Sequence, residues 1–210
     1  MESLAGAAVL TLVLAVIGGY LLGSIPFGLI ATRLGGAGDI RKVGSGNIGA
    51  TNVLRTGRKD LALITLLGDG GKGAVAVLIA RWLTGDPHVI ALAGVAAFIG
   101  HLFPAWLRFA GGKGVATFFG VLLAAAWPVG LMAGATWLLV AAIFRFSSLA
   151  ALAAAALAPV CALLTGQPQP IVWMIVIMAV LIYFRHRENI DRLLEGQEPR
   201  IGGKKDAPAA

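Results

Sequence analysis

Long apolar segments constrain this chain more than any other feature of its sequence. The first runs from Leu4 to Leu22, and others run from Leu61 to Leu83 and from Val89 to Phe109. Each is close to the ~20 residues that an α-helix needs to cross the hydrocarbon core of a bilayer. With 58% hydrophobic and only 13% charged residues in a chain of 210, the sequence predicts an all-α, polytopic membrane protein.

A further apolar block from Val115 to Ile182 is too long for one span, so we divide it at its helix breakers. Three breaker segments stand out, which are Trp127-Pro128, residues 145–148 and residues 165–170. The division gives four more spans and a total of seven transmembrane helices, of which the one from Val115 to Ala126 is short. Near the end of the first span, Ser24, Pro26 and Gly28 predict a kink or a re-entrant segment.

The basic residues predict how the seven spans are oriented. Fifteen of the seventeen Lys and Arg residues fall on one face of this topology, and the other face has only Arg81, since Lys72 lies within a span. By the positive-inside rule, the N-terminus then lies outside and the C-terminus in the cytoplasm. The net charge of +7 is explained by orientation, and we expect no nucleic-acid partner.

The segment GSGNIGATNVLR at residues 44–55 is the first candidate site. Its glycines favour a loop whose backbone can approach a ligand closely, and its donors suit an anion. Arg55 adds a planar fork that matches phosphate or carboxylate oxygens. The alternative is an ordinary polar connector. If the loop binds substrate, the residues concerned are Gly44, Ser45, Gly46, Asn47, Gly49, Thr51, Asn52 and Arg55.

A second glycine-rich turn contains Gly111, Gly112, Lys113 and Gly114. It lacks the spacing and the Ser or Thr of a nucleotide-binding loop. The glycines, the amides at the start of the next span and the Lys113 charge could still bind an anion; the alternative is a plain turn with an interfacial lysine. The topology brings this turn, the 44–55 loop, Ser148 and the segment after Arg185 to the cytoplasmic face, which predicts one pocket for an anionic ligand.

Two charges interrupt the second long span. Asp69 and Lys72 are three residues apart, adjacent on one helical face, and charges at this depth are costly unless they are paired or face a polar cavity. Asp69 and Lys72 could form a structural ion pair or could contact a ligand directly, and the sequence favours neither. The scattered His and carboxylate residues predict no metal site, and the single Cys161 is expected to be a small buried residue. Catalysis would then depend on positioning and electrostatic stabilisation.

Three segments of the chain resemble the bacterial membrane-integral glycerol-3-phosphate acyltransferases that use acyl phosphate as donor. They are GSGNIGATNVLR at 44–55, GHLFPAWLRFAGGKGVAT at 100–117, and His186-Arg-Glu-Asn189 continuing to Gly196-Gln-Glu198. The resemblance implies transfer of a fatty acyl group to the 1-hydroxyl of sn-glycerol 3-phosphate, giving lysophosphatidic acid and phosphate. It also implies a bacterial inner membrane location, membrane lipid around the chain and no cofactor.

The resemblance also implies roles for individual residues. It places catalytic weight on Ser45, Arg55, Lys113, His186 and Asn189, and it places Ser148 near the glycerol phosphate and gives Glu198 a more structural role. Our hypothesis is that the amides of residues 44–49, with Asn47 and Thr51, hold the acyl phosphate. The other substrate would be held by Arg55, Lys113, His186 and Asn189.

A transporter of phosphate or of a small phosphorylated solute is the alternative function, since broken helices and intramembrane charges can line a substrate path. The odd number of spans and the gathering of polar residues on one face favour the enzyme. We expect residues 1–198 to form one acyltransferase domain and residues 199–210 to be a basic, disordered tail. The sequence predicts neither the acyl chain preference nor the oligomeric state.

Overall fold

The computed structural model describes residues 2–202, and throughout this range the chain forms helices and connecting loops with no β-strand. This agrees with the predicted all-α class. The elements in order are α1 (Glu2–Gly23), α2 (Phe27–Leu34), η1 (Ile40–Lys42), α3 (Ala50–Val53), η2 (Leu54–Thr56), α4 (Lys59–Thr84), α5 (Pro87–Leu102), η3 (Ala105–Leu107), α6 (Val115–Ala125), α7 (Trp127–Phe144), α8 (Ser147–Leu164), α9 (Gln169–Arg185) and α10 (Arg187–Leu194).

Five helical segments of the described chain are long and apolar enough to cross a membrane, and a sixth is obtained if α9 and α10, bent by 58° at their junction, count as one span. The seventh expected span corresponds to α6, which has only 11 residues. At 1.5 Å per residue, α6 is about 16 Å long, against a hydrocarbon core of about 30 Å. The chain is therefore a multi-pass membrane protein, and the count of seven spans stays a prediction.

The predicted helix breaks are confirmed. The first helix ends at Gly23 and a second begins at Phe27, with Pro26 between them. The long apolar block is divided into α6, α7, α8 and α9 at the three predicted breaker segments. One expectation is corrected: only residues 44–49 of the 44–55 segment are loop, and the rest forms α3 and η2. After Gly49 no glycine occurs until Gly57, so the backbone there can form a helical turn.

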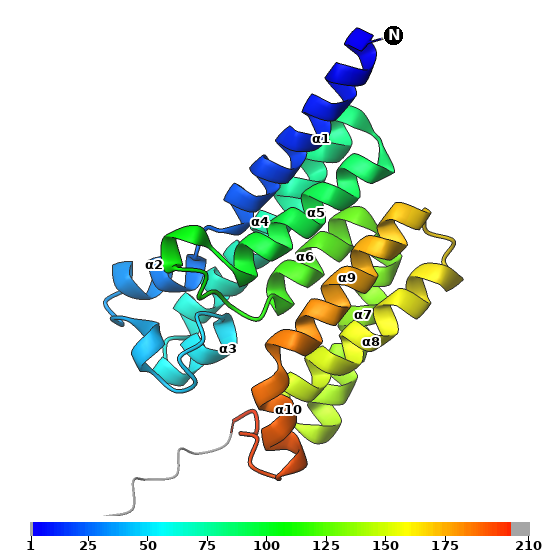
Figure 1. Ribbon diagram of the computed structural model, residues 1–210. Helices are drawn as coiled ribbons and strands as arrows, with labels where there is room; N and C mark the ends of the chain where they lie inside the picture. The colour runs from blue at the N-terminus through cyan, green and yellow to red at the C-terminus, as the bar shows by residue number, and fades with distance from the viewer. Residues whose placement is uncertain (1, 203–210) are drawn as a thin grey trace, which may run out of the picture.

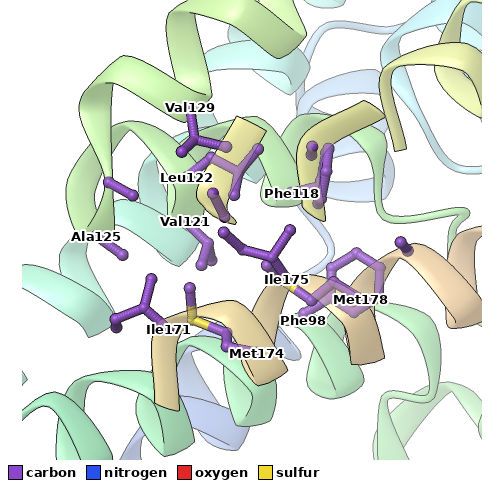
Figure 2. Packing of buried hydrophobic residues seen from close by; sticks show 14 of the residues in the cluster. Phe98, Phe118, Val121, Leu122, Ala125, Val129, Ile171, Met174, Ile175 and Met178 are labelled. Atoms are coloured by element: carbon purple, nitrogen blue, oxygen red, sulfur yellow. The ribbon is translucent and has the colours of Figure 1, made fainter. Parts of the chain in front are cut away.

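Two apolar cores lie inside the bundle. The large core joins α4, α5, α6, α7, α8 and α9, and Figure 2 shows Phe98 and Phe118 packed with Met174, Ile175 and Met178. The small core lies under the first glycine loop and consists of Leu29, Ile40, Ile48, Val53, Leu61 and Ala62. The first loop is therefore anchored by its buried Ile48 and by the flanking Ile40 and Val53 rather than lying free on the surface.

Most of the irregular backbone gathers at one end of the molecule. Figure 1 shows α2, α3, the connection from α5 to α6 and α10 at the end of the bundle away from the N-terminus. Large apolar side chains cover the outside of the helices, as on α7, where Leu131, Leu138, Leu139 and Ile143 are exposed. The bundle thus presents an apolar lateral surface to lipid and a polar end where loops meet.

The chain beyond Glu198 begins as an ordered segment, which corrects the predicted start of the disordered tail. The Ile201 N–H donates to the Arg145 carbonyl at 2.7 Å, and the Arg145 guanidinium donates back to the Ile201 carbonyl at 3.0 Å. The Arg200 guanidinium lies 5.6 Å from the centre of the Phe146 ring. Residues 199–202 thus hold the C-terminal segment against the start of α8. The remainder of the predicted tail, 203–210, lies outside the described residues.

Small residues allow the helices to cross closely. A Cβ on Gly120 of α6 would overlap the carbonyl oxygen of Gly70 on α4, and a Cβ on Gly23 of α1 would overlap the Ala97 carbonyl on α5. Small residues at helix interfaces in membranes let the backbones approach closely enough for good van der Waals packing. By contrast, a Cβ on Gly134 of α7 would meet nothing within 4 Å.

We predict that Gly120→Ala destabilises the bundle, because its methyl group forces α4 and α6 apart. Overpacking of this kind costs about 1–3 kcal/mol. The measurement is the Tm of the detergent-purified protein, followed by tryptophan fluorescence. Gly134→Ala is the matched control and should leave the Tm unchanged or slightly higher; equal Tm values for the two variants would contradict the close crossing.

Candidate active site

The first half of the candidate site is the loop of residues 44–49, whose shape depends on glycine. Gly44 has φ 56° and Gly46 has φ 71°, both in the left-handed region that side chains disfavour. Beneath the loop, a Cβ on Gly28 of α2 would overlap the Ile48 carbonyl oxygen. The loop is therefore seated directly on the backbone of α2.

Asn52 organises this loop. Its buried side-chain amide donates to the carbonyls of Val43 and Asn47, both at 2.8 Å, and of Ile40 at 3.2 Å. Its oxygen accepts from the Ser45 N–H at 3.2 Å and faces the Ser45 hydroxyl at 3.4 Å. The side chain's hydrogen-bonding capacity is thus used within the loop, which gives Asn52 a structural task besides the predicted contact with substrate.

The charged and hydroxyl groups of the first half face outward. Arg55 lies across Gly44, since a Cβ there would be 2.8 Å from the Arg55 Cδ, and its Nη1 is 3.5 Å from the Asn52 oxygen. The side chains of Ser45, Thr51 and Arg55 are exposed. Asn47 accepts from the Gly49 N–H at 3.3 Å. The loop therefore offers hydroxyl and guanidinium donors on its open side.

The second half begins with the turn that leads into α6. The Gly111 N–H donates to the Leu102 carbonyl and the Gly112 N–H to the His101 carbonyl, both at 3.1 Å. Gly114 has φ 85°, and a Cβ there would overlap the Phe98 ring. These glycines let the turn lie flat on α5, and the N–H groups of Gly111 and Gly112 are already used inside the protein.

Arg185 holds this turn from the other side, a role that the sequence analysis missed. Its Nε donates to the Gly112 carbonyl at 3.1 Å and its Nη2 to the Gly111 carbonyl at 3.0 Å. The guanidinium also lies 5.5 Å from the centre of the Phe103 ring. From sequence, an arginine directly after an apolar run is indistinguishable from an interfacial anchor, so no signal pointed to this contact.

A chain of polar side chains joins three predicted residues from distant parts of the sequence. The Lys113 ammonium donates to the Asn189 side-chain oxygen, and the Asn189 amide donates to the Glu198 carboxylate at 2.6 Å. The Ser148 hydroxyl donates to the same Glu198 oxygen at 2.7 Å. Arg192 completes the arrangement, with its Nε 2.8 Å from the other carboxylate oxygen. Asn189 and Ser148 therefore meet at one carboxylate, and Lys113 is linked to it through Asn189.

The electrostatics of this group follow from its burial and its partners. Burial alone would raise the pKa of Glu198, but hydrogen bonds from Ser148, Asn189 and Arg192 outweigh it and hold the pKa below its ordinary value. Burial, followed by repulsion from Arg192, lowers the pKa of Lys113. Glu198 is thus a stable anion that orients its neighbours, and we assign it with Arg192 to the support of the site.

His186 lies at the bend between α9 and α10 and is buried. Its Nδ1 is 2.8 Å from the Ile182 carbonyl. A carbonyl can only accept, so Nδ1 carries a proton, and in the neutral ring Nε2 is left with a free lone pair. The backbone of α9 thereby fixes both the orientation and the tautomer of this histidine.

The predicted residues form two groups at the same end of the bundle. Ser45, Asn52 and Arg55 meet in the first group, and Lys113, Asn189 and Ser148 meet in the second. Among the hydrogen bonds and ion pairs of residues 2–202, none joins the two groups directly. In the same range no three His, Cys, Asp or Glu side chains are close enough to hold a metal ion. The arrangement offers cationic and hydroxyl donors suited to anionic oxygens.

Comparison with known proteins identifies the family. A family model described as glycerol-3-phosphate acyltransferase matches residues 13–196. The glycerol-3-phosphate acyltransferase of Caulobacter vibrioides is 71% identical over 211 residues, covering 100% of this chain and 97% of the relative. That of Paramagnetospirillum magneticum is 62% identical and covers 93% of this chain and 96% of the relative.

Solved structures agree with this relationship. A crystal structure of PlsY, an integral membrane glycerol 3-phosphate acyltransferase, in its glycerol 3-phosphate form has a TM-score of 0.87 and 41% identity, covering 91% of this chain and 96% of the other. The lysophosphatidic acid form gives a TM-score of 0.85 and 40% identity, with 90% and 94% covered. On the strength of the sequence match, which extends over nearly the whole chain, this protein belongs to the glycerol-3-phosphate acyltransferase family.

Proposed function

We propose that this protein transfers a fatty acyl group from acyl phosphate to the 1-hydroxyl of sn-glycerol 3-phosphate, releasing phosphate and lysophosphatidic acid. The observation that carries the proposal is the meeting of Lys113 with Asn189 and, through Glu198, with Ser148. Asn189 and Ser148 already donate to an anionic oxygen, with the Lys113 ammonium beside Asn189, and the phosphate of the acceptor can accept hydrogen bonds of the same kind.

The acceptor is held by the second group and by Arg55. Lys113 and Asn189 bind its phosphate, with Ser148 beside them. His186 accepts a hydrogen bond from a glycerol hydroxyl through Nε2, because its Nδ1 is engaged with the Ile182 carbonyl. This arrangement would fix the attacking oxygen relative to the donor, and such positioning can supply a large part of a rate enhancement.

The donor is held by the first group. Ser45, Thr51 and the backbone of residues 44–49 face its phosphate, and its acyl chain lies among apolar side chains. In the reaction, the acceptor hydroxyl oxygen bonds to the acyl carbon and the bond from that carbon to the phosphate oxygen breaks. The leaving phosphate takes the hydroxyl proton, so no base is required from the protein. Arg55 and Lys113 stabilise the developing negative charge.

The active site lies on the cytoplasmic side of a bacterial inner membrane, in a single acyltransferase domain of residues 1–198. Seven spans place the N-terminus outside and the C-terminus inside, with α6 as the short fourth span. Three features support this arrangement. They are the fifteen basic residues on one side, the gathering of most loops at that end (Figure 1), and, among the described residues, five apolar helical segments of span length together with the bent α9–α10 pair and the shorter apolar α6.

The orientation can be tested by labelling single cysteines with a membrane-impermeant maleimide. In a Cys161→Ala background, we expect Gln169→Cys, at the exposed first residue of α9, to be labelled in intact spheroplasts. Lys42→Cys, near the first glycine loop, should be labelled only after the membrane is permeabilised. Labelling of residue 42 in intact spheroplasts would contradict a cytoplasmic site.

The activity can be tested by phosphate release from palmitoyl phosphate by the purified, detergent-solubilised protein. We expect release to require glycerol 3-phosphate and lysophosphatidic acid to appear in equal amount. Lysophosphatidic acid formed only from acyl-CoA or from acylated acyl carrier protein would contradict acyl phosphate as the donor. Absence of product with all three donors, combined with uptake of glycerol 3-phosphate into proteoliposomes, would instead favour a transporter.

The role of Lys113 predicts a large effect of Lys113→Ala on this activity. Loss of a charge-stabilising donor costs on the order of 100-fold or more in kcat, and the variant should stay folded because Lys113 is only half-buried. Arg55→Ala should act in the same way. Lys42→Ala is the control and should retain wild-type rates; full activity of the Lys113 variant would refute its assignment.

A further inference from the structure

Three titratable side chains are buried inside the bundle, and the proposed reaction uses none of them. Asp69 and Lys72 of α4 form an ion pair of 2.7 Å, with each side chain only 2% exposed. His101 of α5 is 3% exposed, and its Nδ1 lies 3.6 Å from the same carboxylate oxygen, without a hydrogen-bond partner among the described residues. We refer to Asp69, Lys72 and His101 as the buried cluster.

Through Lys72, the buried cluster contacts the backbone just before α2, the helix on which the first glycine loop is seated. The Lys72 ammonium donates to the Ile25 carbonyl at 2.7 Å. Ile25 lies in the break between α1 and α2, directly before Pro26. Because α2 carries Gly28, on which the Ile48 carbonyl is seated, the position of α2 sets the position of the loop. Lys72 therefore fixes the start of the helix that supports residues 44–49.

Through His101 and Asp69, the buried cluster also contacts the turn that contains Lys113 and the start of α6. The His101 carbonyl accepts from the Gly112 N–H at 3.1 Å. The His101 ring lies against the same glycine, because a Cβ on Gly112 would overlap its Nε2. The Thr117 hydroxyl, four residues after Lys113, donates to the Asp69 carbonyl at 2.8 Å. The buried cluster thus contacts the elements on both sides of Lys113.

A contribution to stability alone does not explain why Asp69 and Lys72 lie inside the helix bundle. A charge within a membrane span is costly, and replacing a buried ion pair by apolar side chains is often neutral or stabilising. The ion pair adds directional hydrogen bonds, which can fix the position of a neighbouring backbone. A lysine ammonium has several donors and can bind Asp69 and the Ile25 carbonyl at the same time, which an apolar side chain cannot do.

We propose that Asp69, Lys72 and His101 are positioning residues, which hold the glycine loop and the Lys113 turn at the separation that acyl transfer requires. This inference rests on the proposed function, because it assigns the two substrates to the two loops. The cluster itself touches neither substrate. Its effect is on the distance between the acyl carbon and the attacking hydroxyl.

The test is the double variant Asp69→Leu/Lys72→Met, which removes the ion pair without leaving an unpaired buried charge. We expect it to fold and to keep its Tm within a few degrees of wild type. The donor keeps its contacts with the glycine loop, so its KM should change little; the acceptor keeps Lys113 and Asn189, and its KM should rise only through the contact with Arg55. Misplacement of reacting groups by about 1 Å can reduce a rate about 100-fold, and we expect a fall in kcat of this order.

Arg81→Met is the matched control for the loss of a polar contact on α4. The Arg81 guanidinium donates to the Ala125 carbonyl of α6 at 2.7 Å, towards the other end of the helix. Its loss removes an inter-helix hydrogen bond of the same length but far along α4 from the loops. We expect wild-type kcat and KM in this variant. A fall in kcat equal to that of the double variant would overturn the proposal.

A second pair of variants tests the contact between His101 and Gly112, and it also covers the case in which the double variant fails to fold. Gly112→Ala should lose activity because its methyl group collides with the His101 ring. His101→Ala/Gly112→Ala removes the obstacle and should recover part of the lost kcat. If the second substitution restores nothing, the ring does not set the position of the turn and the proposal fails.

The outcomes separate this inference from the proposed function. If the wild-type protein shows no phosphate release that depends on glycerol 3-phosphate, the proposed function itself is wrong. If the wild type is active and the folded Asp69→Leu/Lys72→Met variant has the same kcat, the function stands and the buried cluster is only a scaffold.

Discussion

The structure depends on one constraint, which is that backbone polar groups at membrane depth must find partners inside the protein. The helices satisfy this by themselves, but the two loops of the site cannot. In the first loop, Asn52 supplies the missing donors to the carbonyls of Ile40, Val43 and Asn47. In the second, Arg185 supplies them to Gly111 and Gly112. The groups that satisfy the backbone are therefore the groups that shape the site.

The same constraint explains why the site lies at one end of the bundle rather than within it. Irregular backbone with open donors can face water there, while the close helix crossings at Gly23 and Gly120 exclude lipid and water below. Deeper in the bundle, Asp69 and Lys72 satisfy each other as an ion pair, and Lys72 also donates to the Ile25 carbonyl, whereas the His101 Nδ1 has no hydrogen-bond partner among the described residues. The large apolar core of Figure 2 fills the remaining space.

The apolar segments and their breakers were sufficient to predict the helices of the bundle. Helix boundaries at Pro26, Trp127 and residues 165–170 follow from local chemistry, since proline and glycine favour turns and loops, although neither rule is strict: Pro159 lies inside α8 and α4 continues through the glycines of residues 68–73. The length of α6 was also visible in the sequence as a short run. Whether so short a helix crosses the membrane depends on how it packs against neighbouring helices, and its own sequence does not contain this information.

The sequence predicts the candidate site as a set of residues, and it contains no signal for the contacts that join them. Glycine-rich segments with lysine and arginine pointed to Gly44–Arg55 and to Lys113, and both segments take part in the arrangement at the polar end of the bundle. The contacts of Glu198 with Ser148 and Asn189 join residues 50 and 9 positions apart. Arg185 acts through backbone carbonyls, and this contact has no sequence pattern. These features arise only when the helices pack.

The position of glycerol 3-phosphate bound to this protein tests the account most directly. A crystal structure or cryo-electron microscopy map of the complex would show it. We predict that the phosphate lies within hydrogen-bonding distance of the Lys113 ammonium and the Asn189 side chain, with a glycerol hydroxyl directed toward His186 Nε2. A phosphate bound only to the 44–49 loop, or away from Lys113 altogether, would contradict the assignment of the two loops to the two substrates.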